Sequence, residues 1–289
     1  MLSILIVSWN TRDLLQACLA SIRRFPPREP LQVIVVDNAS SDGSAELVRQ
    51  EFPEVRLLPQ ERNLGYAAGN NAAFSVADGE WLLTLNPDTE VYEDTLESAL
   101  RKLREHTRFG ALGARQIGVD GGTQRSVRGF PGVLGILGDL TALSRLFPKS
   151  PLGSYSLRAF DYEREGPAPQ PMGTFLLFRK EALAAVGDPK RPFDEAFPIF
   201  FNEVDLLYRL KKAGWPCLYS PDVRVKHYGG ESTKQVRKSM IWESHRSLLR
   251  FFRKHASSPA GRFAMPFLAA AVYAGALIRA RGYHAGFGA

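Results

Sequence analysis

The amino-acid sequence predicts an α/β protein with a doubly wound, mostly parallel sheet and a helical C-terminal appendage. Three short apolar runs, Leu2–Val7, Gln32–Val36 and Trp81–Leu85, have the composition of strands buried on both faces. Segments with helical spacing and turn residues separate these runs. This alternation is typical of a doubly wound fold, in which ligands bind beyond the carboxyl ends of the strands.

Helices are expected in the gaps between these strands. Residues Asp13–Phe25 place apolar side chains at helical spacing behind Thr11, a candidate N-cap. The second gap predicts a helix around Ala45–Phe52, a short strand over Val55–Leu58 and an Ala-rich helix from about Gly65 to Ala77.

The second half of the chain is less regular. Residues 118–171 carry many Gly and Pro residues, which predicts a long irregular segment with a helix near Gly132–Phe147. Such excursions inside a compact domain often form lids or binding loops. Order is expected to return with a strand over Thr174–Phe178 and a helix over Glu203–Ala213, ended by Gly214.

Length and pattern predict one domain over residues 1–235, with halves of about 1–115 and 116–235, and a basic, apolar helical tail over 236–289. Within the tail, Phe263–Ile278 is shorter than the roughly 20 residues of a membrane span and contains Pro266. Three interpretations stay open for this stretch: packing against the domain or a partner subunit, an interfacial membrane helix, and a true span.

Composition narrows the classes of binding partner and the compartment that we expect. The net charge of +7 and a pI near 9.5 favour contact with anions. The basic residues are dispersed without interleaved aromatic residues, so no nucleic-acid partner is expected. Cys18 and Cys217 lie far apart, which indicates reduced core thiols. With no cationic leader ahead of the first strand, we expect a cytoplasmic protein.

Acidic residues stand at the carboxyl ends of two predicted strands. Asp37 ends the second strand, and Asp88 follows the third within Asn86-Pro87-Asp88. A carboxylate at Asp37 could accept hydrogen bonds from a ribose hydroxyl or a base N–H. One carboxylate together with substrate phosphates is a common way to hold Mg²⁺ or Mn²⁺. Each motif, taken alone, also fits a turn or a helix cap.

Further candidates are spread along the chain. Asn63 and Gly65 lie where a helix rich in small residues is expected to begin. Small residues there permit either a close approach of the backbone to a phosphate or tight packing of the helix on the sheet. Glu203 and Asp205 begin a helix behind an aromatic run that could raise a carboxyl pKa, as a general base requires; the helix dipole alone also explains acidic residues there. His227 precedes a Gly-Gly turn and fits a metal, a diphosphate or a structural role.

Taken together, these segments resemble glycosyltransferase family 2, inverting enzymes with the GT-A fold, and especially its rhamnosyltransferase-like bacterial members. The resemblance covers Ile4 to about Thr233. It rests on segments in the family's order, namely Val7-Ser8-Trp9-Asn10, Asp37–Ser44, Asn63-Leu64-Gly65-Tyr66, Leu85-Asn86-Pro87-Asp88, Gly173–Leu177, Phe193-Asp194-Glu195, Asn202–Leu206 and His227-Tyr228-Gly229-Gly230.

The resemblance implies a Rossmann-like GT-A catalytic domain whose first half binds the nucleotide and whose second half binds the acceptor. Asp37 would contact the uracil or thymine of the donor, bordered by Asn10 and Asn63. Asp88 matches the last acidic position of the DXD motif, which holds Mn²⁺ or Mg²⁺ against the diphosphate. Asn86 replaces the first acidic position, so a single strong anionic ligand is supplied.

The later motifs imply the remaining roles. Glu203 aligns with the general base, with Asp205 as its rival, and His227 looks like a late metal or diphosphate contact. The expected reaction moves a sugar from a UDP- or dTDP-sugar to a hydroxyl of a glycan or lipid-linked acceptor, in bacterial cell-surface polysaccharide or glycolipid synthesis. Peripheral contact of the tail with the inner face of the cell membrane, and a homodimer, stay open.

Two other classes of protein compete with this interpretation. A catalytically silent nucleotide-sugar binder or scaffold would be expected to lose the carboxylates of Asp88, Glu203 and Asp205, which are present. A Rossmann-type dehydrogenase would carry G-x-G-x-x-G after the first strand, where Trp9-Asn10-Thr11-Arg12 stands.

Overall fold

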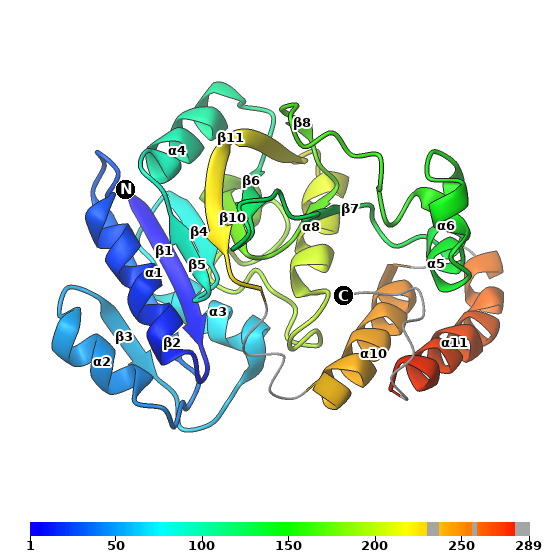
Figure 1. The fold of residues 1–289 in the computed structure, drawn as a ribbon, viewed down its shortest axis with the longest axis horizontal. Coiled ribbons are helices and arrows are strands. Elements are labelled where there is room, and N and C mark those ends of the chain that lie inside the picture. Colours follow the sequence, from blue (N-terminus) through cyan, green and yellow to red (C-terminus); the bar gives the residue numbers. More distant parts are fainter. Residues whose placement is uncertain (230–236, 256–258, 281–289) are drawn as a thin grey trace.

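In the computed structural model, a large mixed β-sheet with helices against both faces forms the body of the protein, and two C-terminal helices lie beside it (Figure 1). The structure describes residues 1–229, 237–255 and 259–280. The main sheet has nine strands: eight run in the order β3-β2-β1-β4-β10-β6-β11-β5, and β8 pairs with β11. Strands β7 and β9 form a separate two-stranded sheet.

The strands are β1 (Leu2–Ser8), β2 (Leu31–Asp37), β3 (Arg56–Pro59), β4 (Trp81–Leu85), β5 (Thr89–Val91), β6 (Ala111–Ile117), β7 (Val127–Arg128), β8 (Gly166–Pro167), β9 (Gln170–Pro171), β10 (Phe175–Arg179) and β11 (Cys217–His227). The helices are α1 (Arg12–Arg24), α2 (Ser44–Glu51), α3 (Gly65–Ser75), α4 (Thr95–Glu105), α5 (Val133–Leu140), α6 (Leu143–Leu146), a 3₁₀ turn η1 (Pro151–Gly153), α7 (Lys180–Ala184), α8 (Asn202–Lys212), α10 (Arg237–His255) and α11 (Pro259–Ala280).

Strand β1 shows why the sheet is buried on both faces. Its side chains alternate, so that Ile4 and Ile6 join the core beneath α1, α2 and α4, whereas Leu5 and Val7 join the core beneath α3 and α8. Every residue of β1 is buried. An uninterrupted apolar run is therefore what this position requires, and the prediction of a mostly parallel α/β sheet is confirmed.

Parallel pairing brings candidate site residues that follow different strands to one edge of the sheet. Strand β1 pairs in parallel with β2 and with β4, and Ser8 lies opposite Asp37 in the first of these ladders. The carboxyl ends of β1, β2 and β4 therefore share one edge of the sheet. Strand β10 lies antiparallel between β4 and β6 and delivers the residues that precede it to the same edge.

Two local expectations need correction. Thr11 precedes α1 as expected, but its hydroxyl meets Ser8 at 3.0 Å and does not cap the helix. Asp42 accepts the N–H of Arg12 at 2.8 Å instead, so the second loop closes the first helix. The helix expected near Gly132–Phe147 is divided into α5 and α6, because Ala142 adopts a left-handed φ of 60° between them.

The C-terminal helices are attached to the body that contains the main sheet. The ring of Phe251 on α10 lies 5.4 Å from that of Tyr208 on α8, and α11 packs against α10 and α5. Helix α11 begins earlier and ends later than the expected Phe263–Ile278, and Pro266 lies inside it. Within the described residues, no helix has the length and apolarity needed to span a membrane. The expected boundary at residues 235 and 236 lies outside the described residues.

Candidate active site

The carboxylate of Asp37 is buried at the end of β2 and only partly used. Its Oδ2 accepts the N–H of Ser40 at 3.1 Å. Its Oδ1 is shielded from solvent and meets no hydrogen-bond donor among the described residues. Buried acceptors in native proteins are nearly always paired, so this oxygen is placed to receive a donor group from a ligand.

Asn10 and Asn63 shape the loops beside Asp37. Asn10, at a φ of 52°, accepts the N–H of Ser41 at 2.8 Å, which joins the loop after β1 to the loop after β2. Asn63 is exposed, and its Oδ1 accepts the N–H of Gly65 at 2.8 Å. The amides therefore order the two loops that border the buried carboxylate.

Gly65 has a packing role in the structure. Its φ is +81°, and an added Cβ would lie 2.8 Å from the carbonyl oxygen of Pro198. The same carbonyl accepts the N–H of Ala67 at 3.1 Å. The start of α3 is thereby held against the loop that leads into α8, which brings the two halves of the domain together at the site.

Asp88 and His227 face each other because β5 and β11 pair in register. Thr89 lies opposite His227, and Asp88 Oδ2 is 3.5 Å from His227 Nε2. The other ring nitrogen, Nδ1, lies 2.8 Å from the amide oxygen of Gln124 and donates its proton there, which fixes the orientation of the ring. Both side chains are buried.

The spacing of this pair fits a shared divalent cation. Two ligands held about 2.1 Å from one ion at angles near 90–110° lie roughly 3.0–3.4 Å apart. The observed 3.5 Å between Asp88 and His227 is close to that. Among the described residues, no group of three or more His, Cys, Asp or Glu side chains gathers around a common point. Any further ligands would have to come from other oxygen atoms.

Asn86 supplies one more shielded oxygen at this edge. Its backbone N–H donates to the carbonyl of Thr174 at 2.9 Å, so the turn after β4 is fixed against the residue before β10. Its side-chain Oδ1 is shielded from solvent and has no donor among the described residues. An amide oxygen in this position can contact a ligand hydroxyl or a cation.

Glu203 lies on the first turn of α8 and borders the residues before β10. An added Cβ at Gly173 would lie 3.5 Å from Glu203 Cγ, and the hydroxyl of Tyr66 donates to the carbonyl of Gly173 at 3.2 Å. Desolvation raises the pKa of Glu203 to about 7, while its own backbone N–H and the charge of Arg128 pull the other way. A carboxyl with this pKa can accept a proton near neutral pH.

Asp205 is engaged elsewhere. It is completely buried, and its two oxygens meet Arg209 Nε, Lys254 Nζ and His255 Nε2, each at 2.8 Å. This arrangement joins α8 to α10. Both oxygens of the carboxylate are engaged by Arg209, Lys254 and His255, so the geometry favours Glu203 over Asp205 as the group that takes a proton.

One residue of the site, Gln124, was absent from the sequence prediction; it holds the ring of His227. A single glutamine in the irregular segment between β6 and β10 carries no spacing signal, so it could not be singled out from the sequence. Arg128 on β7 belongs to the same segment, and the sequence predicts that Arg125 and Arg128 are free to meet a phosphate. Arg128 lies beside Glu203, with its guanidinium 5.7 Å from the ring centre of Tyr155.

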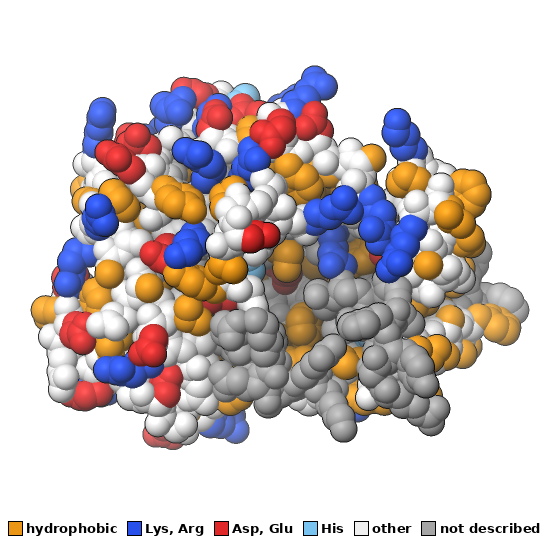
Figure 2. All heavy atoms as spheres, viewed as in Figure 1, with side chains coloured by type: hydrophobic (Ala, Val, Ile, Leu, Met, Phe, Trp, Pro, Cys, Tyr) orange, Lys and Arg blue, Asp and Glu red, His pale blue; other side chains and the backbone are white. Residues whose placement is uncertain are grey.

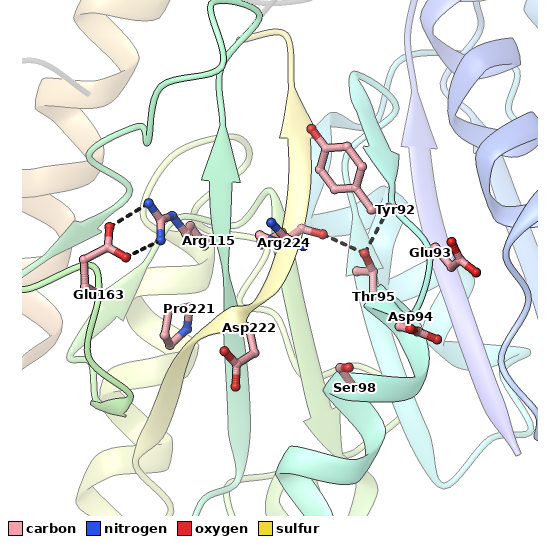
Figure 3. Close-up of a pocket in the computed structure, with 10 residues that line it drawn as sticks. All are labelled: Tyr92, Glu93, Asp94, Thr95, Ser98, Arg115, Glu163, Pro221, Asp222 and Arg224. Carbon is pink, nitrogen blue, oxygen red and sulfur yellow. Dashed lines mark hydrogen bonds and ion pairs between the residues drawn. The ribbon is translucent and has the colours of Figure 1, made fainter.

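A cavity of about 470 Å³ lies at the β5–α4 turn and the bulge of β11 (Figure 3). Its polar groups are largely paired with each other or with neighbours: Arg115 with Glu163 at 2.7 Å, Thr95 Oγ1 with the Arg224 carbonyl at 2.7 Å, and Asp222 with Lys102 at 2.9 Å. None of its lining residues is a predicted site residue. We therefore place the active site at the carboxyl edge of the sheet, where shielded, unpaired oxygens and a raised carboxyl pKa converge.

The comparisons with known proteins identify the family of the chain. Residues 3–187, more than half of the chain, match the family described as Glycosyl transferase family 2. The chain belongs to this family. An N-acetylglucosaminyl-diphospho-decaprenol L-rhamnosyltransferase from Mycobacterium tuberculosis is 31% identical over 262 residues, which cover 85% of this chain and 82% of the relative. The predicted glycosyltransferase activity and the rhamnosyltransferase-like resemblance are thereby confirmed.

Solved structures share the fold of this family 2 chain. The mannosyltransferase PcManGT from Pyrobaculum calidifontis, in complex with GDP-Man and Mn²⁺, superimposes with a TM-score of 0.61 at 18% identity, covering 98% of this chain and 76% of that one. S. aureus TarS in complex with UDP gives a TM-score of 0.52 at 18% identity, covering 89% and 72%. The predicted GT-A fold is confirmed.

Proposed function

We propose that this family 2 glycosyltransferase moves a sugar, with inversion, from a UDP- or dTDP-linked donor to a hydroxyl of a lipid-diphosphate-linked sugar in bacterial cell-surface glycan synthesis. The observation that carries the proposal is the convergence of Glu203 with Asp37, Asn86 and Asp88 at one sheet edge. The relative from M. tuberculosis, named for transfer of L-rhamnose to a diphospho-decaprenol acceptor, supports the acceptor class.

The donor would bind with its base at Asp37. The unpaired Oδ1 of this residue can accept an N–H from uracil or thymine, and the loops closed by Asn10 and Asn63 border that pocket. The diphosphate then extends along the edge of the sheet toward Asp88. Asp37 ends β2 and Asp88 follows β4, and these two strands flank β1 in the sheet, so both carboxylates lie at the same edge.

Mn²⁺ or Mg²⁺ would be held by Asp88 Oδ2 and His227 Nε2, with donor phosphate oxygens completing its coordination. When bound, the ion neutralises negative charge that develops on the departing diphosphate. The role of the chain itself is to orient the ligands: Gln124 holds the imidazole, and the pairing of β5 with β11 holds the carboxylate.

Glu203 would act as the general base. The acceptor hydroxyl attacks C1 of the donor sugar, the bond from C1 to the diphosphate oxygen breaks, and that oxygen leaves with the electron pair. Glu203 takes the hydroxyl proton as the new bond forms. Because attack comes from the side opposite the leaving group, the anomeric centre is inverted.

Arg128 would meet the acceptor. It is half-buried, and its charge acts on the neighbouring Glu203. Guanidinium groups bind phosphate oxygens bidentately, so Arg128 would bind a phosphate of the acceptor. This contact would place the acceptor sugar next to the base. The reaction would run at the inner face of the cell membrane, with the chain peripheral to it.

A donor panel tests the proposal. The purified chain should hydrolyse or transfer from UDP- or dTDP-sugars in the presence of Mn²⁺, and its melting temperature should rise with UDP or dTDP plus Mn²⁺ but not with NAD. Stabilisation by the nucleotide without any turnover across the panel would instead support a catalytically silent binder. If neither turnover nor thermal stabilisation by the nucleotide were seen, the proposed donor site would be wrong.

A further inference from the structure

An exposed apolar surface lies away from the active site, on α5, α6 and α11. Eleven large hydrophobic side chains are exposed among the described residues, and nine of them belong to these three helices or to the residue that follows α6. We call this surface the apolar face; its main members are Leu134, Leu143, Leu146, Phe147, Leu277 and Ile278. Figure 2 shows hydrophobic side chains gathered on this side of the molecule.

Helix α11 has one packed side and one open side. Leu268, Val272 and Ala276 are buried against α10 and α5. Tyr273, Leu277 and the residues at matching helical positions are exposed, so the open side forms an apolar stripe along the helix. Because its other side already packs on the protein, α11 can present only this stripe, as a helix lying flat against a surface does.

Helix α5 contacts both α6 and α11, so the apolar face is one surface. Helices α11 and α5 touch, and an added Cβ at Gly275 would lie 2.9 Å from Leu140 Cδ2. Helix α6 follows α5 after two residues. Both pairs lie side by side at the same end of the molecule in Figure 1.

The charges around the apolar face are positive. Arg145 and Lys149 are exposed on and after α6, next to Leu146 and Phe147. Asp139 is the single acidic residue in α5 and α6, and it is buried; α11 contains none. An apolar stripe flanked by basic residues, with no exposed acidic residue, complements a bilayer with anionic head groups. A protein partner would not require the flanking charges to be basic.

The apolar face is also joined to the catalytic residues. Lys254 and His255 of α10 hold Asp205, two residues after Glu203 on α8, and α11 packs on α10. On the other side, Gly129 donates its N–H to the Tyr155 carbonyl at 2.8 Å, which connects Arg128 to the segment that contains α5 and α6. A surface that binds the apolar face would therefore also fix how Glu203 and Arg128 are oriented relative to that surface.

We infer that the apolar face docks the enzyme on an anionic lipid bilayer, with the stripe of α11 and the end of α6 inserted among the lipid head groups. The inference rests on the proposed function in one respect, that the acceptor is lipid-linked. Docking in this orientation would bring an acceptor diphosphate at the membrane surface toward Arg128 and its sugar toward Glu203.

The test is co-sedimentation of the full chain with vesicles, without donor or acceptor. Wild type should bind vesicles that contain phosphatidylglycerol and bind phosphatidylcholine vesicles weakly. Leu146→Asp and Leu277→Asp should each lower the partition coefficient at least about tenfold, because each removes an inserted apolar side chain and adds a charge. Arg145→Gln and Lys149→Gln should each lower binding to the anionic vesicles about fivefold.

Val119→Asp is the matched control. Val119 is 69% exposed, close to the 72% of Leu146, and it lies outside the apolar face, so its substitution should leave vesicle binding unchanged. Donor hydrolysis in lipid-free solution is measured in parallel for every variant. It should stay at the wild-type level, which separates failure of docking from failure of the proposed function.

Three results would overturn the inference. Wild type that binds neither kind of vesicle while hydrolysing donor would refute docking and leave the function intact, as would Leu146→Asp and Leu277→Asp variants that bind like wild type. A dimer of wild type in sedimentation velocity, split by Leu277→Asp and unable to bind vesicles, would show that a second copy covers the apolar face.

Discussion

Replacing Glu203 with Gln should destroy activity and stabilise the fold at the same time. The substitution keeps the shape of the side chain and removes its ability to take a proton. A positioned general base contributes a factor of about 10²–10⁴, so kcat should fall at least about 100-fold. The second effect follows from the burial that raises the pKa of Glu203 to about 7.

The size and sign of the stability effect follow from the two pKa values. Below the unfolded value of 4.5, Glu203 is protonated in both states and costs nothing. As the pH rises from 4.5 to about 7, the unfolded chain ionises more readily, so stability is lost. Above the folded pKa the loss is complete, and a difference of about 2.5 units corresponds to about 3 kcal/mol. Glu203→Gln should recover about that much at pH 8 and nothing near pH 4.

Two assays measure these effects. Urea unfolding at pH 8 and pH 4.5 should show a gain for Glu203→Gln at the higher pH only, equivalent to roughly 5 °C in melting temperature. Exposed Glu61→Gln is the control and should change neither quantity. In wild type, kcat should fall about tenfold per pH unit below about 7, because the base must be ionised.

Near-normal turnover by Glu203→Gln would refute the assignment of the base. Lost turnover with no stability gain at pH 8 would show instead that Glu203 acts in catalysis without being desolvated as the structure indicates. The two readouts therefore test the chemical role and its physical origin separately.

Three further predictions concern the surrounding residues. Asp205→Asn should lower the free energy of unfolding by about 2 kcal/mol, because it weakens the charge-assisted hydrogen bonds from Arg209 and Lys254 to a buried carboxylate, yet leave donor hydrolysis per folded molecule within about threefold. Urea unfolding and donor hydrolysis measure the two effects, and lost turnover at unchanged stability would make Asp205 the base. Gln124→Leu should weaken Mn²⁺ binding in the presence of UDP about 10–100-fold, measured by calorimetry, since it releases the ring of His227; unchanged affinity would contradict the metal assignment. Arg128→Gln should raise KM for a phosphorylated acceptor. It should also move the acid limb of the pH profile of kcat to higher pH, because the charge of Arg128 lowers the pKa of Glu203. A KM and a pH profile like those of wild type would contradict the placement of Arg128 in the site.

Much of the sheet was visible in the sequence. Leu2–Val7, Gln32–Val36 and Trp81–Leu85 coincide with β1, β2 and β4 within a residue or two, because strands buried on both faces must be continuously apolar. Strands β6 and β11 were not foreseen. Their sequences, ALGARQI and CLYSPDVRVKH, mix charged and apolar residues, since parts of them lie near the edge of the sheet or at a bulge.

The sequence by itself determined the order of the motifs, and with it the family, because collinear short segments are specific even where each alone fits a turn or a cap. It also placed Asp37 and Asp88 at strand ends. The tertiary structure decided what each carboxylate does. Glu203 and Asp205 are two residues apart on one helix, yet Glu203 is desolvated beside the site, whereas Asp205 is held by contacts with Arg209, Lys254 and His255.

The same division holds for Asp88. The sequence marked it as the one strong anionic ligand of its motif, and the structure added His227 at 3.5 Å and Gln124 behind that imidazole. These partners are more than 30 residues away from Asp88 along the chain, so no local pattern links them. The pairing of β5 with β11 brings them together, and burial then makes their few polar contacts decisive.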